Sequence, residues 1–220
     1  MGKDGNIKKA MSKNLLEIDS AFAKQYRGLL EIQQSIKNQL SVYEFDLSEP
    51  EITNAIIERM MAFWFFNVNN NKVILGREIN TTSADFFTET CLFFLKCYFE
   101  KTQGLKVCSE KNIAKGSVIR PDISIWNKDE TILYAAIELK VSDGWKGEKM
   151  LPHLIEREEQ IKNLFPNAYF GVVAFWSFFK ADIKGWNSKY FGLMQFDKNN
   201  KHLRTDSSIE KLIAEINKKI

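Results

Sequence analysis

The sequence is poor in the residues on which several common kinds of site depend. It has only two histidines, His153 and His202, which stand alone, so neither a zinc site nor a catalytic histidine is indicated. Its three cysteines, Cys91, Cys97 and Cys108, are odd in number and do not have the spacing of metal ligands. We therefore expect reduced thiols within the core.

Long apolar runs and a strong charge of either sign are missing too. No stretch reaches the roughly 18 apolar residues that a membrane span requires, and residues 1–13 are polar and lysine-rich, unlike a signal peptide. We expect a cytoplasmic protein without a membrane partner. The formal net charge is only +3, so any surface that binds a polyanion must be local.

Residues 1–71 are predicted to form a helical N-terminal region ahead of a domain that spans residues 72–220. Residues 14–42 read as one long helix with an a/d heptad seam interrupted by two glutamines. The seam consists of Leu15, Ile18, Phe22, Gln25, Leu29, Ile32, Ile36 and Gln39. It is interpreted either as an arm for dimerisation or for gripping DNA, or as a helix packed on its own domain. A second helix is predicted over residues 52–68.

Two predicted strands, residues 118–126 and 133–141, are joined by a short polar turn and read as an antiparallel hairpin. Side chains two apart share one face of a strand. Asp122 therefore points away from its neighbouring isoleucines, and Glu138 and Lys140 lie opposite an apolar face formed by the odd-numbered residues of the second strand. Pairing centred on residue 130 places Asp122 opposite Glu138, and any even register keeps both carboxylates and Lys140 on one face.

A pair of carboxylates beside a lysine suits a hard divalent cation. Mg²⁺ prefers carboxylate oxygens and leaves positions open for phosphate oxygens, so a phosphodiester is the natural substrate. Lys140 would orient the attacking water or stabilise the developing negative charge.

Pro121-Asp122 and Glu138-Leu139-Lys140 resemble the two halves of the PD-(D/E)XK nuclease motif, which many restriction enzymes carry. The resemblance implies an α/β protein with a restriction-endonuclease-like core: a helix, a three-stranded antiparallel meander, a second helix and a strand, here with an N-terminal helical extension. It also implies that Asp122, Glu138 and the carbonyl of Leu139 bind the metal, and that Lys140 acts at the attacking water.

The elements predicted around the motif follow that order. They are a helix over residues 82–101, a strand over 106–113, a helix over 148–165 and a buried strand over 168–176. Members of this superfamily often contribute a glutamate from the first helix to the metal site. Glu89 is the candidate for that role, although it also reads as a solvated residue, and Glu110 is the alternative.

Six further side chains are candidates for contacts with nucleic acid. They are Trp145, Lys146, Arg157, Gln160, Lys180 and Lys184. In residues 178–190, lysines alternate with aromatic residues, a pattern that fits nucleic acid but also fits lysines around a hydrophobic cap. Residues 190–196 form a predicted strand, and a capping box at residues 207–210 opens a final helix.

Together these features favour a Mg²⁺-dependent deoxyribonuclease, with Mn²⁺ as a substitute metal. The resemblance implies a restriction or defence endonuclease that hydrolyses double-stranded DNA and leaves 5′-phosphates, with a homodimer through the heptad seam. Two alternatives remain open: a catalytically inactive nucleic-acid-binding or assembly protein on the same fold, and a structure-specific repair or recombination nuclease.

Overall fold

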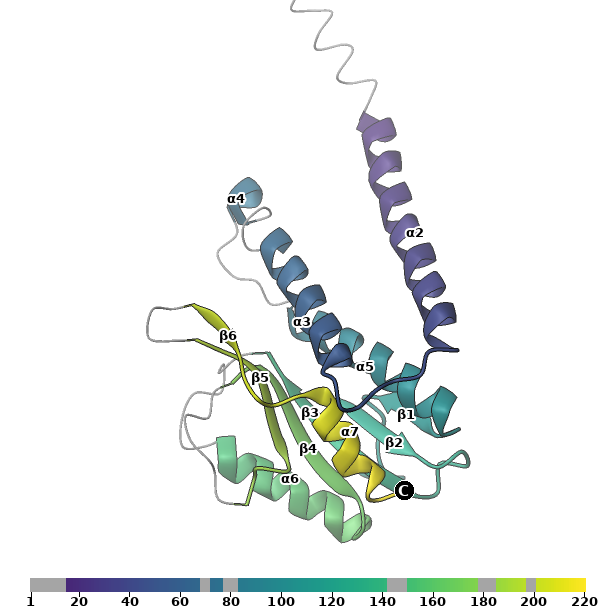
Figure 1. The fold of residues 1–220 in the computed structure, drawn as a ribbon, viewed down its shortest axis with the longest axis vertical. Coiled ribbons are helices and arrows are strands. Elements are labelled where there is room, and N and C mark those ends of the chain that lie inside the picture. Colours follow the sequence, from purple (N-terminus) through teal and green to yellow (C-terminus); the bar gives the residue numbers. More distant parts are fainter. Residues whose placement is uncertain (1–14, 68–71, 77–82, 142–149, 178–184, 197–200) are drawn as a thin grey trace, which may run out of the picture. The chain divides into compact units, whose positions relative to one another are not determined.

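The computed structural model describes residues 15–67, 72–76, 83–141, 150–177, 185–196 and 201–220 (Figure 1). The chain divides into two compact units, Met1–Glu44 and Phe45–Ile220. The first unit contains helix α2 (Leu15–Leu40), which confirms the long helix expected there. The helices of the second unit are α3 (Glu51–Trp64), α4 (Lys72–Leu75), α5 (Ser83–Thr102), α6 (Met150–Leu164) and α7 (Ile209–Asn217).

Helix α3 belongs to the second unit, so the units divide at residue 44, whereas the sequence suggested a boundary at residue 71. The reason is packing: Ile52, Ile56 and Met60 form a buried stripe on α3, and this helix contacts α5 and α7. An amphipathic helix takes most of its stability from such contacts. The end of α3 is therefore not the end of a domain.

A mixed six-stranded sheet forms the centre of the second unit, which confirms the α/β class (Figure 1). Its strands, in spatial order, are β1 (Lys106–Ser109), β2 (Ile123–Trp126), β3 (Leu133–Lys140), β4 (Tyr169–Trp176), β5 (Tyr190–Phe196) and β6 (His202–Arg204). Strands β1, β2 and β3 form an antiparallel meander, β4 and β5 are parallel to β3, and β6 is antiparallel to β5.

Helices cover both faces of this sheet. In β4, Val172 packs in a buried cluster with Leu154 of α6. Phe175, on the opposite face of the strand, contacts Phe87 of α5 with ring centroids 5.8 Å apart. Every residue of β4 is buried, which confirms the prediction of a strand covered on both sides.

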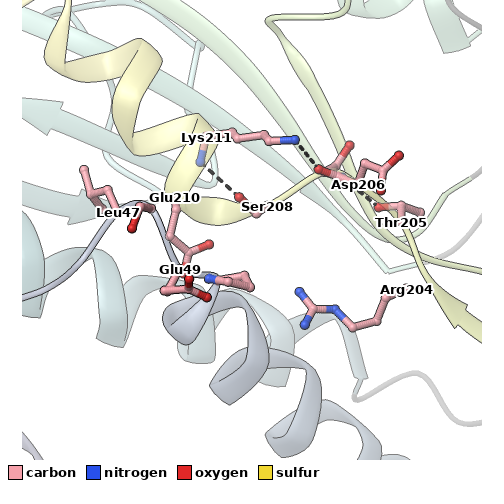
Figure 2. A pocket seen from close by; sticks show the side chains of 11 residues that line it. Leu47, Glu49, Arg204, Thr205, Asp206, Ser208, Glu210 and Lys211 are labelled. Atoms are coloured by element: carbon pink, nitrogen blue, oxygen red, sulfur yellow. Dashed lines mark hydrogen bonds between the residues drawn. The ribbon is translucent and has the colours of Figure 1, made fainter.

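The start of α7 differs from the predicted capping box. Ser208 is the N-cap, and its hydroxyl accepts a hydrogen bond from the N–H of Lys211 at 3.1 Å (Figure 2). The carboxylate of Glu210 instead reaches α3, where it accepts from the N–H of Thr53 at 3.0 Å and from its hydroxyl at 2.5 Å. The same hydroxyl accepts from the N–H of Ile209 at 2.8 Å. The two helix starts thus cap each other, beside a pocket of about 450 Å³.

Candidate active site

The β2–β3 hairpin confirms the predicted antiparallel pairing and its register. Ile123 pairs with Ile137 and Ile125 pairs with Ala135. One step further along the same register, Asp122 lies opposite Glu138, as the symmetry of the turn predicted. The strand itself begins at Ile123 and is shorter than expected.

A shift in register near the turn corrects one part of the prediction. Leu133 was expected to share a face with Ala135, but the register shifts between Ile125 and Trp126, and Leu133 joins the buried cluster that includes Ala136. Such a bulge moves a residue to the other face of its strand. The side chains beyond it, toward Glu138, keep the predicted alternation.

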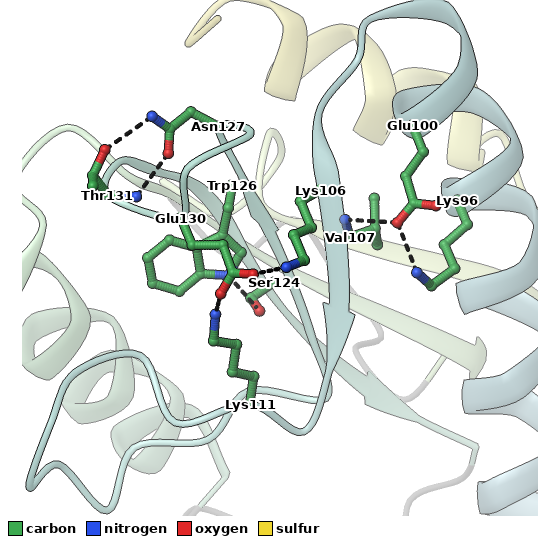
Figure 3. A network of polar contacts seen from close by, with 10 residues as sticks. All are labelled: Lys96, Glu100, Lys106, Val107, Lys111, Ser124, Trp126, Asn127, Glu130 and Thr131. Atoms are coloured by element: carbon green, nitrogen blue, oxygen red, sulfur yellow. Dashed lines mark hydrogen bonds and ion pairs between the residues drawn. The ribbon is translucent and has the colours of Figure 1, made fainter.

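Polar contacts fix the turn of this hairpin. The side-chain oxygen of Asn127 accepts hydrogen bonds from the N–H groups of Thr131 at 2.8 Å and Ile132 at 2.9 Å. Figure 3 shows the carboxylate of Glu130 paired with the ammonium groups of both Lys106 and Lys111. Because turn geometry sets the register of a hairpin, these contacts determine which residues lie opposite each other at its far end.

Two carboxylates and an ammonium group meet at that far end. Oδ2 of Asp122 accepts a hydrogen bond from the backbone N–H of Leu139 at 2.6 Å. Nζ of Lys140 donates to Oε2 of Glu138 at 3.1 Å and lies 3.7 Å from Oδ2 of Asp122. Three of the predicted site residues therefore contact each other, although 16 positions separate Asp122 from Glu138 in the sequence.

Helix α6 adds a fourth charged group, Arg157. Its Nε lies 3.4 Å from Oε1 of Glu138, an ion-pair distance without hydrogen-bond alignment. Both atoms are buried and have no hydrogen-bond partner among the described residues. The sequence suggested Arg157 only as a nucleic-acid contact. Its helical spacing of three residues from Leu154 and four from Ile161, which are both buried, was the signal that Arg157 faces the sheet.

The environment of Glu138 disfavours its charge. The residue is only 6% exposed. Burial raises the pKa of its carboxyl, the charge of Lys140 opposes that shift, and the neighbouring Asp122 adds to it, so that the pKa lies above its usual value. A buried carboxyl beside a second carboxylate is typical of a functional site.

These groups fit a hard cation. Oε1 of Glu138 is a buried carboxylate oxygen without a hydrogen-bond partner in the described part of the chain. The N–H and C=O of a strand residue point to the same side, so the carbonyl of Leu139, like its N–H, faces Asp122. Oxygen donors of this kind suit Mg²⁺ or Mn²⁺. Within the described ranges, no group of three or more histidine, cysteine or acidic side chains could hold a metal, so a third acidic ligand is not assembled.

The two candidates for that third ligand occupy different positions. Glu89 is exposed on α5. Glu110 follows β1 in a left-handed conformation (φ +48°), and its backbone N–H donates to the carbonyl of Asp122 at 3.1 Å. The backbone of Glu110 is therefore in contact with Asp122.

The other predicted contacts with nucleic acid have different outcomes. Trp145, Lys146, Lys180 and Lys184 lie outside the described residues, and Gln160 donates a hydrogen bond to Glu156 on its own helix at 3.1 Å.

In the segment of alternating lysines and aromatic residues, the described part forms a hydrophobic cap. Trp186 is buried, and Nζ of Lys189 lies 5.6 Å from its ring centre. The same ammonium group is bound by both carboxylate oxygens of Glu158, at 2.7 and 2.8 Å. These two residues are therefore structural, as the alternative interpretation of the pattern proposed.

None of the helices within the described ranges combines the length and the apolarity needed to cross a lipid bilayer. No family model matches the chain, and neither does any curated protein or solved structure with which it was compared.

Proposed function

We propose that the chain is a Mg²⁺-dependent nuclease that hydrolyses DNA phosphodiester bonds at the Asp122–Glu138–Lys140 cluster. The observation that carries this proposal is the convergence of the three side chains at the open end of the β2–β3 hairpin. The order α5, β1–β2–β3, α6, β4 supports it, because it is the order of a restriction-endonuclease-like core.

The metal would be held by the carboxylates of Asp122 and Glu138 and by the carbonyl of Leu139. A bound Mg²⁺ supplies charge neutralisation at the phosphate and lowers the pKa of a coordinated water. The site is also partly closed to solvent, since the side chains of Glu138 and Lys140 are 8% and 20% exposed. Charges in such a site act more strongly than they would in water.

Two cations of the chain would act on the phosphate itself. Lys140 is held between both carboxylates, so its ammonium is in place to orient the attacking water and to stabilise negative charge on phosphorus-bound oxygens. The guanidinium of Arg157 offers donors that match two phosphate oxygens. A phosphate would thus meet positive charge from β3 and from α6.

Cleavage of plasmid DNA tests the proposal directly. We expect nicking in Mg²⁺ or Mn²⁺ that Asp122→Asn abolishes. Asp129→Asn is the matched control, because this exposed carboxylate lies in the turn of the same hairpin. Full cleavage by the Asp122→Asn protein would refute the assignment, and the ends of the product would show whether 5′-phosphates are left.

An assembly role is the second candidate, and one observation favours it. On α2, the heptad-seam residues Leu29 and Ile32 are 58% and 57% exposed. A seam of this type pairs with a second helix. A homodimer formed through α2 is compatible with a nuclease that cuts both strands, and equally with a protein that binds nucleic acid without cleaving it. Binding without nicking in any metal would favour the non-catalytic function, and cleavage of branched but not linear DNA would favour a repair or recombination nuclease.

A further inference from the structure

An aromatic cluster lies where strands β4 and β5 end. Phe196 stacks on Trp176 with ring centroids 4.5 Å apart and an interplanar angle of 20°. His202 of β6 contacts both rings, at 4.9 and 5.1 Å. Trp64, at the end of α3, meets Trp176 edge to face at 6.0 Å. Four aromatic residues from four elements therefore form one continuous group.

The cluster lies at the same edge of the sheet as the candidate active site, because β3, β4 and β5 are parallel and end at Lys140, Trp176 and Phe196. Lys140 pairs with Ala174, and Trp176 lies two residues further along β4. The alternation of β4 is interrupted before Trp176, because the N–H of Val172 donates toward β5, to Lys189, whereas that of Trp176 donates toward β3, to Val141. Trp176 pairs with Met194, and Phe196 again lies two residues further. Each diagonal step between adjacent strands spans roughly 8 Å. The row from Lys140 through Trp176 to Phe196 is thus roughly 16 Å long, a length comparable to a few nucleotides of one DNA strand.

The outer part of the cluster is accessible. Phe196 is 53% exposed although Trp176 covers one of its ring faces, and His202 is exposed as well. Both belong to the β5–β6 pair, and β6 is an edge strand whose residues are all exposed. The indole N–H of Trp176 is buried without a hydrogen-bond partner among the described residues. The exposed ring of Phe196 is therefore the part of the cluster that a further flat, aromatic group can cover.

Positive charge accompanies the aromatic surface. Arg204 alternates with Leu203 along β6, so it lies on the same face of the strand as His202. Its register partner is Met194, and His202 pairs with Phe196. The guanidinium of Arg204 donates a hydrogen bond to the side-chain oxygen of Asn54 on α3 and stays exposed. A cation beside an exposed ring is the combination that single-stranded nucleic acid requires, since the ring stacks on a base and the cation faces a phosphate.

We propose that Phe196, supported by Trp176 and flanked by His202 and Arg204, is a stacking site for an unpaired nucleotide of the DNA substrate. The proposal rests on the proposed function and defines its substrate class: DNA with a single-stranded segment next to the cleaved bond. A base inside a duplex already stacks on its neighbours and cannot cover the ring, so fully paired DNA would not use this site. Stacking also tolerates any base, and we expect little sequence preference here.

Binding of labelled DNA to the full chain tests the site. Fluorescence anisotropy would compare a single-stranded 20-mer with the blunt duplex of the same sequence, with Ca²⁺ in place of Mg²⁺ so that the DNA stays intact. From the range known for base–aromatic stacking, we expect Phe196→Ala to weaken single-strand binding between about 5-fold and about 150-fold and to change duplex binding less than about 2-fold. Phe196→Trp should retain single-strand binding.

Leu203→Ala is the matched control, because Leu203 is 43% exposed on the same edge strand but points to its other face. It should bind like the unchanged protein. A 20-mer that contains 2-aminopurine gives a readout without any substitution, since its fluorescence falls when the base stacks on a ring. Equal loss of single-strand and duplex binding, unchanged binding by Phe196→Ala, or no 2-aminopurine quenching would each overturn the proposal. Failure of the nuclease assignment would appear separately, as cleavage that is insensitive to Asp122→Asn.

Discussion

Replacing Glu138 by glutamine should have opposite effects on stability with and without metal. Burial raises the pKa of Glu138, so the folded chain holds this proton more tightly than the unfolded chain does. The contribution of this proton to the free energy of unfolding is therefore fully present below the usual glutamate pKa of 4.5. It is lost as the pH rises through the raised pKa of Glu138. Glutamine mimics the protonated form. Without metal at pH 8, we expect Glu138→Gln to melt at a higher temperature than the unchanged protein. At pH 4 we expect the two proteins to have the same Tm.

If Glu138 is a metal ligand, adding Mg²⁺ makes the unchanged protein melt at a higher temperature than Glu138→Gln. At a Mg²⁺ concentration 100 times Kd, binding stabilises the folded chain by about 2.7 kcal/mol. For a unit of this size, that corresponds to a rise of about 5 to 10 °C in Tm. The glutamine variant should gain little, because it has lost the charged ligand oxygen. Its melting curve would then lie above that of the unchanged protein without metal and below it with metal.

The assay is thermal unfolding followed by circular dichroism, with and without Mg²⁺, at pH 4, 6 and 8. Glu159→Gln is the control, because Glu159 is exposed on α6 and should show neither effect. A structural ion pair behaves differently: if Glu138 served only to pair with Lys140 and Arg157, removing its charge would lower Tm at pH 8 without metal. That result would refute the reasoning.

Three further predictions concern other parts of the chain. Lys140→Ala should lower kcat by about 10²- to 10³-fold while calorimetry still detects Mn²⁺ binding, and loss of that binding would contradict its role. Thr53→Val leaves Glu210 and a buried N–H without their hydroxyl partner, so urea unfolding should show a loss of about 2 to 5 kcal/mol; a loss below about 1 kcal/mol would argue against mutual capping. Leu29→Glu combined with Ile32→Glu should convert a dimer to a monomer in light scattering, and an unchanged oligomer would exclude the seam as the interface.

The centre of the candidate site could be predicted because one short turn controls it. Strand alternation fixed the face of Asp122, and the near symmetry of the hairpin about residue 130 placed it opposite Glu138. The prediction failed at Leu133, where the backbone shifts by one residue. Trp126 and Leu133, the pair at this shift, both lie in the buried cluster, and the periodicity of the sequence does not report such a shift.

The rest of the site depends on contacts that no local pattern encodes. The stack of Phe196 on Trp176 requires the parallel register of β4 and β5, and no turn sets that register because a long connection joins the strands. The hydrogen bonds between Thr53 and Glu210 likewise depend on a contact between distant parts of the chain, and they replace the local cap that the sequence predicted. A glutamate three residues after a serine predicts a local cap, but a distant helix start competed for its carboxylate.

The bond between Thr53 and Glu210 also sets an order of events during synthesis. The two residues are 157 positions apart, so at ordinary translation rates the second emerges roughly 8 to 30 s after the first. Until then, the N–H of Thr53 has only water as an acceptor. The start of α3 can therefore be capped only after α7 has been synthesised.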